Sequence, residues 1–189
     1  MSLVSLSEVG STTRLVFGDR RLIVDNTDLA TLSADALVCP VTPACDTRMG
    51  LAQILNDAAG GLSRDGRPMV HEPFGKVIVL PAGQLRAKYV FLSVLLGERG
   101  LDKIRLSIRQ AVDRSIHYAE FLRLKSIAFP FLGSALELPP YEFVARQMIE
   151  EVALYMRRRK TRLKLVLFSI RNPEAFEAFR KEARSLANL

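Results

Sequence analysis

The sequence has no tryptophan and only two cysteines, Cys39 and Cys45, among its 189 residues. Two cysteines are too few for a disulfide framework, and neither has partners at the spacing of a zinc-binding motif. We therefore expect both thiols to be small buried apolar groups, and we expect no metal and no cofactor.

Long apolar runs are also absent. No stretch reaches the roughly 20 predominantly apolar residues of a membrane-spanning helix. The N-terminal stretch MSLVSLSEVGSTTR lacks the basic segment and long apolar run of a secretory signal. The sequence therefore predicts a cytoplasmic protein with no membrane partner.

The composition is typical of a folded protein and not of a disordered one, with 49% hydrophobic and 25% charged residues. The length suits one domain, which we expect to cover residues 1–189 with a core at about 13–187. The net charge of +7 favours anionic partners. Nucleotides, nucleic acid and simple solubility all remain compatible with it.

Short apolar runs alternate with segments of helical periodicity along the chain. Strands are expected at 13–17, 21–25, 36–39, 76–80, 88–95, 126–129 and 163–168. Helices are expected at 51–58, 101–122, 139–155 and 173–186. This alternation predicts an α/β fold, a three-layer α/β/α sandwich around a mixed, largely parallel sheet with an antiparallel edge.

Three loops follow the expected strands that end at Cys39, Phe129 and Phe168. Ligands in such sheets bind outside the carboxyl ends of the strands, so these loops should share one rim. In the stretch 125–142 a strand and a Gly/Ser loop lead into a helix that opens on two prolines, and such a helix start is a natural phosphate seat. An ordinary connection without a ligand is the alternative.

Four stretches of this order resemble the macro domain, the ADP-ribose-binding and Appr-1-p processing family. The resemblance covers roughly residues 22–184. It is carried by Asp28-Leu29 with ADALV at 34–38, by 49–60, by GKVIVLPAGQLRAKYV at 75–90, and by KSIAFPFLGSALELPPYEFVA at 125–145. The last two stretches are the most specific.

The resemblance implies a set of residues that bind a nucleotide diphosphate. Asp28 would accept a hydrogen bond from the adenine amino group, and Leu29 would assist through its backbone. Two groups would face the phosphates through backbone amides: Gly50, Leu51 and Ala52, and then Gly133, Ser134, Ala135 and Leu136. Phe168 would lie against the adenosine, with a role in the core as its alternative.

Three departures from the family pattern bear on activity. Thr42 stands where the family has the asparagine that orients the distal ribose, and the family's glycine loop is reduced to TRMG at 47–50. Glu137 adds a carboxylate where a diphosphate would bind, which is unfavourable unless the side chain turns to solvent. The pocket is either open or closed by Met49 and Glu137.

The sequence therefore predicts a module that binds ADP-ribose or a related nucleotide diphosphate with little or no hydrolase activity. One alternative is an ADP-ribosyl or O-acetyl-ADP-ribose hydrolase in which Asp46 acts as the catalytic base. A second alternative is a nucleic-acid-binding derivative that uses Arg157, Arg158, Arg159 and Lys160. That basic run is also compatible with a solvated helix end.

Overall fold

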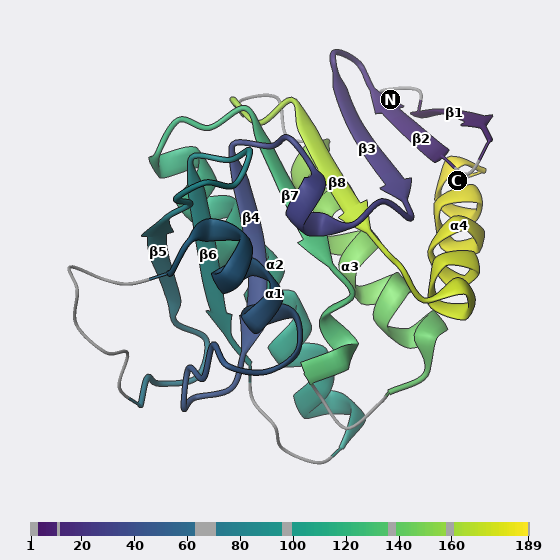
Figure 1. Cartoon of the computed structure of the whole chain (residues 1–189). Coiled ribbons are helices and arrows are strands. Elements are labelled where there is room, and N and C mark those ends of the chain that lie inside the picture. Colours follow the sequence, from purple (N-terminus) through teal and green to yellow (C-terminus); the bar gives the residue numbers. More distant parts are fainter. Residues whose placement is uncertain are drawn as a thin grey trace.

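The computed structural model describes residues 4–10, 12–62, 71–95, 100–135, 139–157 and 161–188. Within this part of the chain, eight strands form one sheet in the order β1-β2-β3-β8-β7-β4-β6-β5, and helices cover both of its faces (Figure 1). The strands are β1 (Val4–Val9), β2 (Thr12–Phe17), β3 (Arg20–Asp25), β4 (Ala36–Val41), β5 (Val77–Pro81), β6 (Tyr89–Val94), β7 (Ser126–Pro130) and β8 (Leu165–Ser169). The helices are α1 (Gly50–Ala59), α2 (Leu101–Phe121), α3 (Tyr141–Met156) and α4 (Pro173–Ala187).

The two faces of the sheet carry different helices. One apolar cluster joins the sheet to α2, α3 and α4, and the other joins it to α1 and to a short 3-10 helix at Leu29–Thr31. The predicted three-layer α/β/α sandwich is therefore confirmed. No helix in the described ranges is both long and apolar enough to cross a membrane.

The centre of the sheet is parallel, from β3 through β8, β7 and β4 to β6, whereas β1, β2 and β5 are antiparallel. Every residue of β4 is buried, as the apolar run predicts for a strand covered on both faces. The strand continues through Pro40, beyond the predicted end at Cys39. Proline is tolerated there because β4 pairs with β7 only at Ala36 and Leu37, which leaves the later part of that side without a ladder.

Two further details differ from the sequence-based expectation. The strand β1 was not predicted. It is an edge strand whose side chains are mostly exposed on both faces, so its sequence shows little of the alternation between apolar and polar residues that marks a half-buried strand. Helix α3 begins at Tyr141, after the two prolines and not on them. The proline ring fixes φ but not ψ, and a ψ of 137° keeps Pro140 extended at the N-cap.

The end of α1 and the β5–β6 connection approach each other closely at Gly83. Its φ is +57°, and a Cβ there would lie 2.1 Å from the Ala59 carbonyl oxygen. We predict that Gly83→Ala lowers the free energy of unfolding by about 2–4 kcal/mol. The new methyl group would force the backbone away from the Ala59 carbonyl oxygen, and alanine would also have to adopt a left-handed conformation. Urea denaturation measures this change.

Gly18→Ala is the matched control, since Gly18 has a φ of +65° and no atom within 4 Å of the place where a Cβ would lie. It should cost only about 1–2 kcal/mol, the left-handed conformation alone. Equal losses in the two variants would show that the close approach at Gly83 does not constrain the fold.

Candidate functional site

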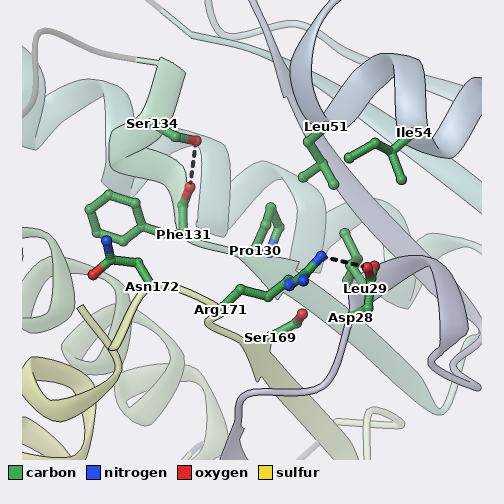
Figure 2. A pocket seen from close by; sticks show the side chains of 10 residues that line it. All are labelled: Asp28, Leu29, Leu51, Ile54, Pro130, Phe131, Ser134, Ser169, Arg171 and Asn172. Atoms are coloured by element: carbon green, nitrogen blue, oxygen red, sulfur yellow. Dashed lines mark hydrogen bonds and ion pairs between the residues drawn. The ribbon is translucent and has the colours of Figure 1, made fainter. Parts of the chain in front are cut away.

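A pocket of about 220 Å³ opens at the carboxyl edge of the sheet, between the loops that follow β3, β7 and β8 and the first turns of α1 (Figure 2). Its lining residues are Asp28, Leu29, Leu51, Ile54, Pro130, Phe131, Ser134, Ser169, Arg171 and Asn172. The loop after β4 contributes through α1, to which it leads. The predicted loops after β7 and β8 therefore share this rim, whereas no residue of the loop after β4 itself lines the pocket.

Asp28 presents a fixed carboxylate to the pocket. Its Oδ1 accepts a hydrogen bond from the Ala30 amide at 3.0 Å and thereby caps the short 3-10 helix. Its Oδ2 accepts one from Arg171 Nη1 at 2.8 Å. Because each carboxylate oxygen has two lone pairs, Asp28 can still accept a hydrogen bond from a ligand.

Arg171 was not among the residues predicted for the site. It lies two positions after β8, and its guanidinium reaches across the pocket to Asp28 in Figure 2. The position on the rim was the signal available in the sequence. The pair joins the β3 and β8 loops, and Arg171 remains 68% exposed, so its positive charge is open to a ligand.

Much of the wall around Asp28 is apolar and includes Leu29, Leu51, Ile54 and Phe131. The Phe131 ring packs edge-on against Tyr141, with 5.5 Å between ring centroids. A mainly apolar wall with a few fixed polar groups is typical of small-molecule pockets. Such a wall suits a flat organic ring.

The first turn of α1 supplies backbone donors at the pocket edge. Met49 at the N-cap makes no side-chain hydrogen bond to this turn. The amides of Gly50, Leu51 and Ala52 have no partners within the helix, because the first N–H groups of any helix lack them. Leu51 lines the pocket, whereas the Ala52 methyl lies in the core, so only its amide is available.

The loop after β7 forms a 3-10 helix at Leu132–Ala135. Ser134 Oγ donates to the Phe131 carbonyl oxygen at 3.1 Å and closes this turn. A Cβ at Gly133 would lie 2.5 Å from the Phe131 ring, so the glycine lets that ring form the pocket wall. Leu136 and Glu137, predicted to bear on ligand binding, lie outside the described residues.

Thr42 and Asp46 are among the predicted residues that do not line this pocket. Thr42 is exposed and closes a turn, its carbonyl oxygen accepting from the Cys45 amide. Asp46 is held by Arg48, with Nε and Nη2 donating at 2.9 and 3.0 Å. These hydrogen bonds lower the pKa of Asp46 to about 2, which makes it a weak proton acceptor near neutral pH.

The side chain of Phe168 does not face the pocket, and the predicted adenosine contact is corrected accordingly. Its ring is fully buried between Phe129 and Phe179, at centroid distances of 6.1 and 5.2 Å. Side chains alternate along a strand, so the next residue, Ser169, is the one that lines the pocket. Met49 is 70% exposed and does not fill the pocket either.

The two cysteines lie in the core and offer no accessible nucleophile. Burial raises the pKa of Cys39 to about 12, and burial with the nearby Glu72 carboxylate raises that of Cys45. Within the described ranges, no three His, Cys, Asp or Glu side chains gather as a metal site. The charged groups that the described part of this pocket presents are the Asp28 carboxylate and the Arg171 guanidinium.

Fold and site together define an α/β/α domain with a pocket at the carboxyl edge of the sheet. A family model for the Macro domain matches residues 44–148. An uncharacterized protein of Sulfolobus acidocaldarius is 30% identical over 85% of this chain and 88% of its own length. The chain belongs to the Macro domain family.

Solved structures show the same fold at low sequence identity. The Oceanobacillus iheyensis macrodomain with ADP has a TM-score of 0.82 and 13% identity, over 97% of this chain and 98% of that one. The Trypanosoma brucei macrodomain in complex with ADP-ribose has a TM-score of 0.72 and 17% identity, over 85% of this chain and 68% of that one. At these identities the likeness establishes the fold.

The burial of Cys39 and Cys45 predicts that neither thiol reacts in the native protein. Iodoacetamide at pH 8 should label neither within the time that labels both in urea, because the reactive thiolate is scarce and shielded. Mass spectrometry counts the added groups. Rapid native labelling at either site would show an accessible thiol that the structure does not contain.

Proposed function

We propose that this protein binds ADP-ribose or a related nucleotide diphosphate in the pocket beside Asp28, with little or no hydrolase activity. The observation that carries the proposal is the Asp28 carboxylate, fixed by Ala30 and Arg171 next to an apolar wall. The structural neighbours described with ADP and ADP-ribose support it.

The adenosine would occupy the part of the pocket nearest Asp28. The exocyclic amino group of adenine is a donor that matches the carboxylate, and Leu29 and Ile54 offer apolar contact to the ring. The volume of about 220 Å³ lies below the range of about 300–1,000 Å³ for sites that enclose whole ligands. The rest of the ligand would therefore extend along the open rim.

The diphosphate would lie between the first turn of α1 and the Gly133–Ser134 turn. The first amides of α1, which have no partner within the helix, and the positive end of the helix dipole favour an anion there. The exposed guanidinium of Arg171 adds a full positive charge on the same rim. Two sets of backbone amides, in the first turn of α1 and in the Gly133–Ser134 turn, and the Arg171 guanidinium would together complement the negative charge of a diphosphate.

The low hydrolase activity follows from the loop after β4. The Thr42 side chain has no amide group to orient a ribose. The Asp46 carboxylate accepts hydrogen bonds from Arg48, which lower the pKa of Asp46 to about 2. Neither side chain lines the pocket. We propose that residues 1–189 form one macro-type domain that retains binding without this catalytic machinery.

Calorimetric titration with ADP-ribose tests the binding proposal. We predict saturable binding that Asp28→Ala weakens by about ten- to a hundredfold, the cost of a hydrogen bond to a charged acceptor. ADP should bind through the same pocket and lose affinity in the same variant. Asp57→Ala, which removes an exposed carboxylate of α1 that does not line the pocket, should bind as the native chain does.

Absence of ADP-ribose binding in the folded native protein would contradict the proposal, as would equal affinity in the two variants. Thermal melting of each variant separates loss of the ligand interaction from loss of the fold. Incubation with a mono-ADP-ribosylated protein should release no ADP-ribose. Turnover that Asp46→Ala abolishes while ADP-ribose affinity is kept would instead establish the hydrolase.

A further inference from the structure

Positively charged side chains line the amino-terminal edge of the parallel strands, at the opposite end of the sheet from the pocket. This edge is uppermost in Figure 1, where β7, β8, β4 and β6 begin. We call it the basic edge and define it by Arg21, Arg86, Lys88, Arg123, Lys125, Arg162 and Lys164. Each of them lies at the start of one of these strands, at the start of β3, or in the segment that leads into one.

Backbone hydrogen bonds connect the basic edge from strand to strand. The Arg21 amide donates to the Lys164 carbonyl oxygen at 2.9 Å. The Lys164 amide in turn donates to the Lys125 carbonyl oxygen at 2.8 Å. The Lys125 amide donates to Asp35 Oδ2 at 2.7 Å, and the Lys88 amide donates to the Asp35 carbonyl oxygen at 3.0 Å. At about 4.8 Å between strands, the line from β3 to β6 spans about 19 Å.

Acidic side chains neutralise only part of this edge, because three carboxylates, Asp19, Asp35 and Glu120, lie along it beside the seven cations. Lys88 pairs with Asp35 at 2.9 Å, and Lys164 pairs with Asp19. The other five cations have no carboxylate partner among the described residues: Arg21, Arg86, Arg123, Lys125 and Arg162. Unpaired cations in a line produce a field that favours an extended polyanion.

A hollow of about 280 Å³ interrupts the basic edge between β4, β6 and β7. Ser33, Arg86, Lys88 and Ser126 supply its donors, and Asp35 also lines it. The Asp35 carboxylate is already engaged by Lys88 and by the Lys125 and Ser126 amides. The hollow therefore offers hydroxyl and cationic donors to a phosphate or a base edge.

An exposed aromatic ring stands beside the basic edge. Phe121 ends α2 and is 81% exposed, the highest fraction among the described large hydrophobic side chains. The turn after it leads through Arg123 to Lys125. Glu120, next to Phe121, accepts hydrogen bonds from the Arg162 and Leu163 amides at 2.9 and 3.1 Å, so the end of α2 is tied to the segment before β8.

We propose that the basic edge binds single-stranded nucleic acid, with phosphates along the cations and an unpaired base stacked on Phe121. Cations that follow a backbone and an aromatic face that stacks bases are the two components of such sites. A duplex would leave no base free to stack, and an acidic peptide would make no use of the ring. Arg157, the described member of the predicted basic run at 157–160, lies at the C-terminal end of α3.

Fluorescence anisotropy with a labelled twelve-nucleotide oligouridylate tests this proposal on the full chain. The combined variant Arg123→Glu, Lys125→Glu and Arg162→Glu should weaken binding by at least about a hundredfold at low salt. Its slope of log affinity against log salt should be shallower by about 0.7 for each phosphate that the variant no longer neutralises. Phe121→Ala should weaken binding about tenfold without changing the slope.

Lys181→Glu, an exposed charge reversal on α4, is the matched control and should bind as the native chain does. Asp28→Ala and saturating ADP-ribose should also leave RNA binding unchanged, which separates this edge from the pocket. Three results would overturn the proposal: no binding at low salt, equal loss in Lys181→Glu, or an unchanged affinity in Phe121→Ala. Equal binding of a polyglutamate peptide would likewise assign the edge to acidic protein partners.

Discussion

The parallel register of β3, β8 and β7 is the constraint on which the site depends. Asp25 pairs with Ser169, and Ser169 pairs with Pro130, so three strands end at the same level. Because the strands are parallel, all three connections leave from the same edge of the sheet. This places Arg171 Nη1 2.8 Å from Asp28 Oδ2, although the two residues lie 143 positions apart in the sequence. A shift of one residue between these strands would turn Phe168 out of the core and Ser169 into it.

The architecture was predictable because hydrophobic period and turn chemistry agree along most of the chain. The buried run 36–39 identified a central strand, and the apolar spacing in 101–122 identified α2 almost to the residue. What failed were features that burial does not encode. The exposed strand β1 has no apolar face to reveal it, and the entry to α3 depends on the ψ of Pro140, which its ring leaves free.

The candidate site was predictable in its location and less so in its side chains. Asp28, Leu51 and Ser134 line the pocket as the family resemblance implied, whereas Phe168 faces the core because alternation along β8 decides which neighbour points outward. Asp46 was a plausible base by position, but an arginine two residues away holds it. Arg171 was missed because its role arises from a contact between distant loops, and its position on the rim was the one signal that the sequence carried.

The central claim is that the carboxyl edge binds a nucleotide diphosphate through Asp28 and the amides of α1. A crystal structure of the protein with ADP-ribose tests it most directly. We expect the adenine within hydrogen-bonding distance of Asp28 and the diphosphate against the amides of Gly50 and Leu51. An empty Asp28 pocket at saturating ligand, or ADP-ribose bound elsewhere on the sheet, would contradict the account.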